Sequence, residues 1–240
     1  MADEEEMRGR TRRFYARYGN ELEQIRELLE IKLRQVCLAY TINHQLPKTA
    51  IVVRSRVKSQ ESFLLKLESE GWPDFYYPWE VIKDLIGARI VCWFMDDCYN
   101  IVDSVMQSTL LTPRGESGFS LRDYIKNPQD AGYRGIHFYM DIKYDSVQLV
   151  DGQVRLVPQD MLCEIQVRTK LQDAWADLTH DFLYKKGSED GSDVYEALLA
   201  DVARRLETED RTLVKLRDFY KGLADTKMKE GKRQGFRPRG

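Results

Sequence analysis

Apolar positions recur with helical spacing near the start of the chain. The steps are three and four residues long, and charged residues lie between them. This is the period of one buried helix face, and the positions are Leu22, Ile25, Leu29, Leu33, Val36 and Tyr40. The pattern predicts a helix over 14–43 that ends before Pro47. Residues 1–13 precede the pattern, and we expect them to be flexible.

The next segments read as strands and short helices. Residues 51–58, IVVRSRVK, predict a strand with Arg54, Arg56 and Lys58 on one face, because these positions are two residues apart. Ser59 is a suitable N-cap for a helix to about residue 69. Residues 88–95 are almost entirely apolar and predict a central strand. A helix over about 97–110 follows.

The second half begins with an irregular stretch at 112–131, which is rich in glycine, proline and charge. Long interior loops are usually functional or mobile. Strands are predicted at 135–144 and 161–168, with a turn at 151–153 between them. A helix over about 170–185, a linker and a long helix over about 193–224 follow. The basic tail, 226–240, is expected to be disordered.

Strands alternate with helices through the middle of the chain, which indicates an α/β (α+β) class. We expect a single domain over 14–225. The helices at 14–43 and 193–224 are long for covering one small sheet. Their exposed faces could pack against another subunit of a homo-oligomer.

Composition narrows the function. Charged residues make up 32% of the chain, but the formal net charge is −2, so the protein is not a basic coat for nucleic acid. The most apolar run, LIGARIVCWFM, contains Arg89 and is too short to span a membrane. The first ten residues are acidic and lack the apolar core of a secretory signal. We expect a cytoplasmic protein with no membrane contact.

Cysteine and histidine spacing gives no sign of a metal site. No C-x-x-C pair occurs, and the three histidines lie far apart in the sequence. The cysteines are expected to be buried free thiols, and they are Cys37, Cys92, Cys98 and Cys163.

The strand LCEIQVR, 162–168, holds the strongest chemical signal. Glu164, Gln166 and Arg168 lie on one face of it. Taken alone, this pattern favours an edge strand with a solvated polar face. Likewise, Asp84 alone could be a helix cap and Arg89 a surface ion pair.

Considered together, these segments indicate one chemical function. Carboxylates from two of them could hold Mg²⁺, and cations from a third could neutralise a polyphosphate. These are the parts that phosphoryl or pyrophosphoryl transfer requires. The chain has no G-x-x-x-x-G-K-[ST] motif, so it is not a P-loop enzyme.

Five motifs, in this order and spacing, resemble the synthetase domain of the RelA/SpoT alarmone family. They are RVKS (56–59), DLIGARI (84–90), RDYIKNPQDAGYRGIH (122–137), EIQVRT (164–169) and WADLTHDFLYK (175–185). The resemblance covers roughly 50–186 and suggests a small alarmone synthetase with a helix at each end. It implies a nucleotidyltransferase-like fold, in which a mixed, mainly antiparallel sheet of about five strands is flanked by helices.

The resemblance also implies a reaction and its donor side. Pyrophosphate would move from ATP to the 3′-hydroxyl of GDP or GTP, releasing AMP and making (p)ppGpp. Arg56 and Arg89 would stack on adenine, while Lys58 and Lys66 would meet the ATP phosphates. Asp84 and Glu164 would bind Mg²⁺, and Glu164 could also accept the proton of the attacking hydroxyl.

The acceptor side, by the same resemblance, involves five residues. Tyr133 would stack on the acceptor base, and His137 would lie near the acceptor phosphates. Gln166 and Arg168 would position the acceptor and phosphates. Arg122 belongs to the same group and stands where the family usually has lysine.

Further departures from the family pattern lie in the acceptor loop. Gln129 and Ala131 replace a lysine and an asparagine, and Gly135 stands where serine is common. Three alternatives therefore stay open beside the GDP or GTP acceptor. One is a toxin that pyrophosphorylates the 3′ end of tRNA and is restrained by an antitoxin. The second makes adenosine alarmones. The third is a catalytically silent RNA-binding module.

Overall fold

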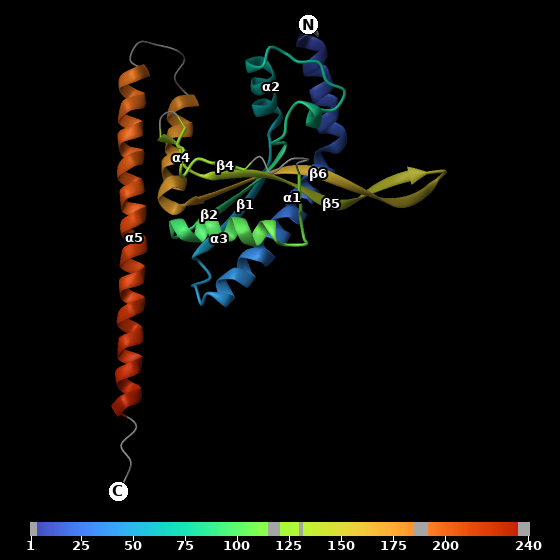
Figure 1. Ribbon diagram of the computed structural model, residues 1–240. Coiled ribbons are helices and arrows are strands. Elements are labelled where there is room, and N and C mark those ends of the chain that lie inside the picture. Colours follow the sequence, from blue (N-terminus) through green and yellow to red (C-terminus); the bar gives the residue numbers. More distant parts are fainter. Residues whose placement is uncertain (1–3, 115–120, 130–131, 185–191, 235–240) are drawn as a thin grey trace.

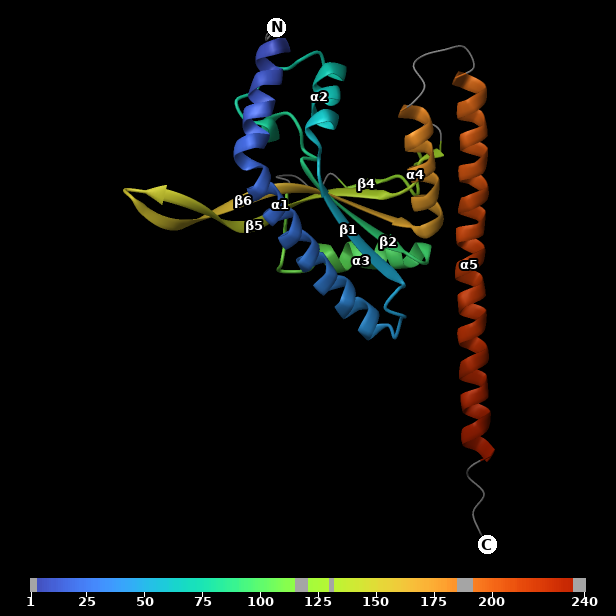
Figure 2. The ribbon, with the colours of Figure 1, turned by 180° about the vertical axis from the view of Figure 1, so that it is seen from behind.

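A mixed sheet runs through the middle of the molecule, seen from two sides in Figures 1 and 2. The computed structural model describes residues 4–114, 121–129, 132–184 and 192–234. Its elements are α1 (Glu4–Asn43), β1 (Ile51–Val57), α2 (Gln60–Ser69), a 3₁₀ turn (Pro78–Glu80), β2 (Ile86–Cys92), α3 (Met95–Met106), β3 (Thr112–Pro113), β4 (Arg122–Asp123), β5 (Ile136–Val150), β6 (Gln153–Thr169), α4 (Lys170–Tyr184) and α5 (Ser192–Gln234).

The strand order is β1-β2-β6-β5-β3, and β4 also pairs with β5. Strands β2 and β6 are parallel, whereas the other pairs are antiparallel. The predicted class is therefore confirmed. The sheet has six strands rather than about five, because two short strands form within the stretch that the sequence predicts to be irregular.

One face of the sheet is apolar and forms the core. Ile86, Ala88 and Ile90 of β2 point to it, as do Ile165 of β6 and Phe138 of β5, and all are buried. Helices α1 and α3 supply the other half of this core. The opposite face of the same strands carries polar side chains. This one-sided burial is typical of sheets with antiparallel strands.

Helix α1 begins at Glu4 instead of residue 14, so the prediction of a flexible segment over 1–13 is corrected from Glu4 onward. Met7 and Thr11 are fully buried. Arg10 donates to the carbonyl of Phe75 at 2.7 Å. Packing against the loop after α2 therefore stabilises a first segment that has no strong helical pattern of its own.

The boundaries around β2 also differ from the prediction. β2 spans Ile86–Cys92 rather than 88–95. Its pairing with β6 ends at Cys92, opposite Thr169, and Phe94 is the N-cap residue of α3, which starts at Met95. The apolar residues after Cys92 are thus divided between a turn and a helix. The predicted Ser59 cap is confirmed, because its hydroxyl accepts from the backbone N of Ser62 at 3.1 Å.

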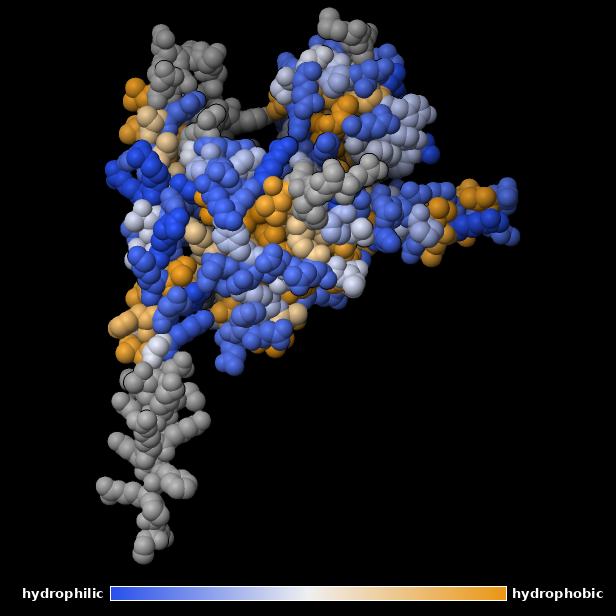
Figure 3. Space-filling model, viewed as in Figure 1, coloured by the Kyte–Doolittle hydropathy of each residue, from blue (hydrophilic) through white to orange (hydrophobic). Residues whose placement is uncertain are grey.

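Strands β5 and β6 are longer than predicted and form a two-stranded ribbon beyond the rest of the sheet (Figure 1). Their register runs without a break to Val150 opposite Gln153. Four apolar side chains near the tip are exposed, and Figure 3 shows apolar patches among hydrophilic ones there. They are Val147, Leu149, Val154 and Leu156.

Helix α5 stands beside α4 at one end of the sheet (Figures 1 and 2). It continues to Gln234, so the prediction that 226–240 is disordered is wrong for residues 226–234. Residues 235–240 lie outside the described part of the chain. No helix within the described ranges has an apolar stretch long enough to cross a membrane.

The four cysteines are free and buried, which confirms that prediction. Burial raises the pKa of the Cys37 thiol to about 12, with a smaller contribution from Cys92. These thiols are therefore core side chains.

The packing of α1 predicts two different outcomes on one helix. Leu33 is fully buried and Leu38 is 52% exposed. Leu33→Ala should lower the free energy of unfolding by about 2–5 kcal/mol, because it leaves a cavity in the core. The control Leu38→Ala should change it by less than about 0.5 kcal/mol. Chemical denaturation followed by circular dichroism measures both. Equal effects would contradict the packing described.

Candidate active site

The polar face of the sheet carries an ordered row of side chains. Pairing places Arg54 opposite Arg89, Arg89 opposite Gln166, Gln166 opposite His137, and His137 opposite Arg122. Paired residues point to the same face of a sheet. The row therefore crosses five strands, β1, β2, β6, β5 and β4, and unites Arg54 with residues from three of the five motifs.

A second row lies two residues along each strand. Arg56 pairs with Gly87, Gly87 with Glu164, and Glu164 with Tyr139. Gly87 leaves the space between Arg56 and Glu164 without a side chain. A cavity of about 300 Å³ lies over both rows, and it is lined by Arg54, Ser55, Arg56, Asp84, Gly87, Ala88, Arg89, Glu164, Gln166 and Asp177.

Asp84 precedes β2 and faces two lysines. Lys58 Nζ lies 2.8 Å from Asp84 Oδ2, and Lys66 Nζ lies 3.6 Å from Oδ1. Lys58 is held at this place because its backbone N donates to the carbonyl of Leu85 at 2.8 Å. Burial tends to raise the pKa of Asp84, but the hydrogen bond and charge of Lys58, with Lys66, outweigh it and lower the pKa. Asp84 is therefore a carboxylate at neutral pH.

Glu164 lies on the central strand β6 with a partner for each oxygen. Gln166 Nε2 donates to Oε2 at 2.9 Å, and His137 Nδ1 lies 3.3 Å from Oε1. Burial tends to raise the pKa of Glu164, but His137 and Gln166 lower it overall. The negative charge of Asp84 acts in the opposite direction. The two carboxylates therefore lie close enough to repel each other.

Tyr133 reaches the same site through His137. Its hydroxyl lies 2.6 Å from His137 Nε2, and burial is the main cause that raises the pKa of this hydroxyl. Gly135 makes room for the ring, since a Cβ there would lie 3.0 Å from the Tyr133 hydroxyl oxygen. Tyr133, His137 and Glu164 thus form one chain of contacts.

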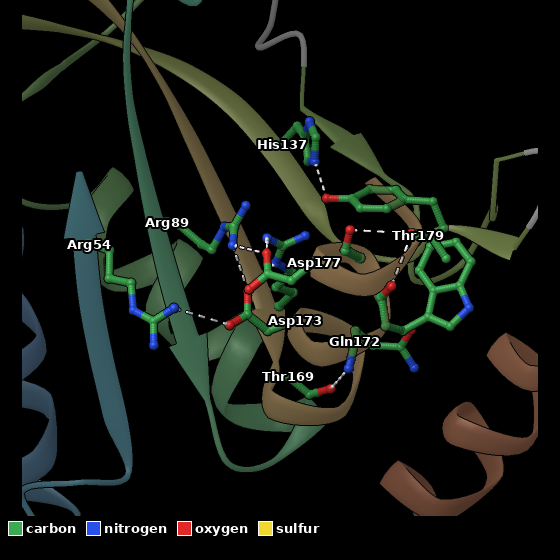
Figure 4. A network of polar contacts seen from close by, with 12 residues as sticks. Arg54, Arg89, His137, Thr169, Gln172, Asp173, Asp177 and Thr179 are labelled. Atoms are coloured by element: carbon green, nitrogen blue, oxygen red, sulfur yellow. Dashed lines mark hydrogen bonds and ion pairs between the residues drawn. The ribbon is translucent and has the colours of Figure 1, made fainter. Parts of the chain in front are cut away.

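Helix α4 contributes two carboxylates that the sequence reading missed (Figure 4). Arg89 Nη1 donates to Asp173 Oδ1 at 3.0 Å and to Asp177 Oδ1 at 2.6 Å. Arg168, which is buried, has its Nε 2.8 Å from Asp173 Oδ1. Arg54 approaches Asp173 at 3.8 Å. The available signal was the four-residue spacing, which places both carboxylates on one helix face.

The remaining predicted residues lie around this centre. Arg56 is exposed and lines the cavity. Lys66 lies on α2 beside Asp84. Arg122 is exposed on the edge strand β4, at the end of the row. The structure thus gathers the predicted residues on or beside one face of the sheet, while their individual roles stay predictions. Ala131 and the side chain of His180 lie outside the described part.

The residues present fit a magnesium ion. Asp84 Oδ1 is buried and has no hydrogen-bond partner, and Glu164 lines the same cavity. Mg²⁺ is commonly held by one or two carboxylates together with substrate phosphates and water. Among the described residues, no group of three or more His, Cys, Asp or Glu could hold a metal alone. Asp84 and Glu164 would therefore hold the ion jointly with a phosphate ligand.

The fold and site define a mixed α/β protein in which cationic side chains and two carboxylates, Asp84 and Glu164, surround one cavity. Residues 55–189, more than half of the chain, match the family model described as the region found in RelA / SpoT proteins. The chain belongs to this family. The resemblance based on five motifs is thereby confirmed.

Two curated relatives come from Bacillus subtilis. The chain is 34% identical over 133 residues to the GTP pyrophosphokinase YwaC, covering 55% of this chain and 57% of YwaC. It is 28% identical over 173 residues to the GTP pyrophosphokinase YjbM, covering 72% of each. The match thus spans little more than half the length of YwaC.

Solved structures of similar proteins align with most of the chain. The small alarmone synthetase 1 of Bacillus subtilis, bound to its product pppGpp, aligns with a TM-score of 0.69 and 26% identity, over 86% of this chain and 97% of that one. A GTP pyrophosphokinase family protein of Streptococcus pneumoniae aligns with a TM-score of 0.70 and 24% identity, over 87% and 95%. The second likeness supports the fold alone.

The Asp84–Lys58 pair predicts a pH dependence of stability. The pKa of Asp84 is lowered by folding from its ordinary 3.8, so the pair contributes stability above that value and loses it as pH falls through the folded pKa. Near neutral pH, the free energy of unfolding of the wild type should exceed that of Asp84→Asn by about 1–3 kcal/mol. The gap should shrink below about pH 4. Urea denaturation at several pH values measures the gap, and a constant difference would contradict the assignment.

Proposed function

We propose that this chain is a pyrophosphokinase that transfers the β,γ-diphosphate of ATP to the 3′-hydroxyl of GDP or GTP. The products are AMP and ppGpp or pppGpp. One observation carries the proposal: Asp84 and Glu164 share a single cavity with Arg54, Arg56 and Arg89. Both Bacillus subtilis relatives are named GTP pyrophosphokinases, and this supports the same reaction here.

The geometry supports a division of labour among the residues. Arg56 and Arg89 would hold the adenine of ATP, and Lys58 and Lys66 would bind its phosphates. Glu164 is ionised at neutral pH because its pKa is lowered, so it can accept the proton of the 3′-hydroxyl. A bond forms between that oxygen and the β-phosphorus, and the bond from this phosphorus to the α,β-bridging oxygen breaks. The bridging oxygen leaves with AMP.

Magnesium would supply charge neutralisation for the phosphates. Asp84 and Glu164 are the residues that would hold it. Positioning and charge stabilisation perform most of the catalysis in phosphoryl transfer. The buried Arg168 and the row through Gln166 and His137 are suited to that task, because they leave few rotational freedoms at the site.

For the acceptor, we propose a guanosine nucleotide. Tyr133 would stack on its base, and His137, Gln166, Arg168 and Arg122 would orient it and its phosphates. The names of the relatives favour this acceptor over the 3′ end of tRNA. A silent RNA-binding module is disfavoured, because pure binding of an anion would not need two carboxylates in the same cavity.

We also propose association with a second copy through the terminal helices. Ile31, Leu38 and Ile42 are exposed on α1, and Leu216 and Phe219 on α5. Exposed apolar side chains at this density are typical of interaction surfaces. An antitoxin partner belongs only to the tRNA alternative.

A transfer assay tests the proposed reaction. ATP labelled on its β- and γ-phosphates is supplied with GDP, GTP, an adenosine nucleotide or deacylated tRNA, in the presence of Mg²⁺. Label should appear in the guanosine products, together with an equal amount of AMP. Label found only in tRNA or only in an adenosine nucleotide would show that this molecule, and not a guanosine nucleotide, is the acceptor. If label reaches none of these acceptors, the proposal that the chain is a pyrophosphokinase is wrong.

Glu164→Gln tests the proposed base. The amide keeps the shape of the side chain but cannot accept the proton, so kcat should fall by about 10²–10⁴-fold. The thermal transition should stay close to that of wild type. Glu68→Gln, at an exposed position on α2, is the matched control and should keep normal turnover. Near-normal turnover in Glu164→Gln would remove Glu164 from the mechanism.

A further inference from the structure

One stripe of α5 faces the acceptor side of the site. Apart from the adjacent pair at its start, its members follow one another at steps of three or four residues and thus share a helix face. They are Leu199, Ala200, Ala203, Glu207 and Asp210. We call this set the inner stripe of α5. None of these residues belongs to the motifs that carry the family resemblance, and none lines the cavity.

The upper part of the inner stripe touches the backbone just before Tyr133. Gly132 has a φ of +85°, and a Cβ placed on it would lie 2.6 Å from Ala203 Cβ and 3.2 Å from Ala200 Cα. The chain therefore passes α5 so closely that only glycine fits there. The position of the Tyr133 backbone is set by where α5 lies.

Glu207 extends this contact to the next residue. Arg134 is buried, and its Nη2 lies 2.8 Å from Glu207 Oε2. Its Nη1 donates to the carbonyl of Ile125 at 2.8 Å. Arg134 thus joins α5 to both ends of the segment that runs from β4 to β5. Tyr133 lies between two residues, Gly132 and Arg134, that are each fixed against α5.

Asp210 acts at the junction of β6 and α4. It is fully buried, and its Oδ2 accepts from Thr169 Oγ1 at 2.8 Å and from Gln172 Nε2 at 3.2 Å. Thr169 Oγ1 in turn accepts from the backbone N of Gln172 at 3.2 Å. Thr169 follows Arg168 directly and ends β6, and Figure 4 shows it beside Gln172, which lies on the first turn of α4, the helix that carries Asp173.

Trp175 links the two groups of contacts. Its indole Nε1 donates to the carbonyl of Leu199 at 3.3 Å, and its ring centroid lies 6.3 Å from that of Tyr133. The inner stripe therefore reaches Tyr133 by two routes, through the chain at Gly132 and Arg134 and through Trp175.

Polar contacts rather than apolar burial hold α5 in this place. Ala203 and Asp210 are the only buried side chains among those described for α5. A buried charge pair contributes little net stability to the fold. Removing one partner nevertheless destabilises the protein strongly, because the other charge stays buried without compensation. The polar contacts of α5 therefore fix where this helix lies more than they stabilise the fold.

We propose that Glu207 and Asp210 are positioning residues for the acceptor nucleotide. They act through Arg134 and Thr169 to fix Tyr133 and Arg168, and neither touches the acceptor itself. Among the described residues, no hydrogen bond or ion pair joins the inner stripe to β1 or β2, the strands of the ATP side. This proposal rests on the proposed function, because it assigns Tyr133 and Arg168 to the acceptor.

Steady-state kinetics of Glu207→Gln and Asp210→Asn give the first test. The KM for GDP should rise about tenfold or more in each, and the KM for ATP should stay within about twofold. Glu209→Gln is the matched control, since Glu209 is exposed on the same helix turn. Glu207→Asp, which keeps the charge, should recover part of the GDP affinity. Equal rises in both KM values, or wild-type values in both variants, would overturn the proposal.

Hydrogen exchange in the absence of any nucleotide gives a second, independent test. Glu207→Gln should speed amide exchange over residues 132–137 relative to Glu209→Gln, with a similar thermal transition. Exchange changed only within α5 would refute the coupling. If wild type transfers nothing to GDP or GTP, the proposed function fails, while the exchange result still decides whether α5 fixes Tyr133. If Asp210→Asn does not fold, both tests are made with Glu207→Gln, because Glu207 is partly exposed.

Discussion

The parallel pairing of β2 with β6 is the interaction on which the site depends. It places Gly87 opposite Glu164 and Arg89 opposite Gln166, although these residues are far apart along the chain. Parallel neighbours need a long crossover connection, and here it contains α3 and the β3–β5 segment. A shift of one residue in this register would turn Glu164 and Gln166 into the apolar core. The buried face of the strands therefore fixes the chemistry of the opposite face.

The electrostatics of the site follow from placing many charges on one half-buried surface. Each carboxylate of the centre has a cationic or hydrogen-bonding partner: Lys58 for Asp84, His137 and Gln166 for Glu164, and Arg89 and Arg168 for Asp173. An incoming polyphosphate would compete with carboxylates for the same cations. In the structure, these carboxylates compensate the cations of the site, and few buried charges there lack a partner.

The terminal helices serve the sheet in different ways. Helix α1 buries a long apolar stripe under the sheet and is a component of the core. Helix α5 buries little apolar surface, and its contacts with the rest of the protein include Gly132, Arg134, Thr169 and Trp175, and Asp96 of α3 through Arg217. A change in the position of α1 would disturb folding, whereas a change in the position of α5 would first affect the backbone around Tyr133.

The sequence by itself determined the class of fold, the polar face of β6 and the family. Period-two alternation in 162–168 separates Glu164, Gln166 and Arg168 from the core residues, and this information is local. The motifs predicted the residues of the site because most of those residues lie on a strand or at a strand end within one motif. Only the tertiary structure decided the helical start of α1, the ribbon of β5 and β6, and the placement of Asp173 and Asp177 beside the arginines. It also decided that α5 lies against Gly132. These features depend on contacts between distant segments, and a local pattern of apolar and polar residues does not record which partner a helix face or a carboxylate will meet.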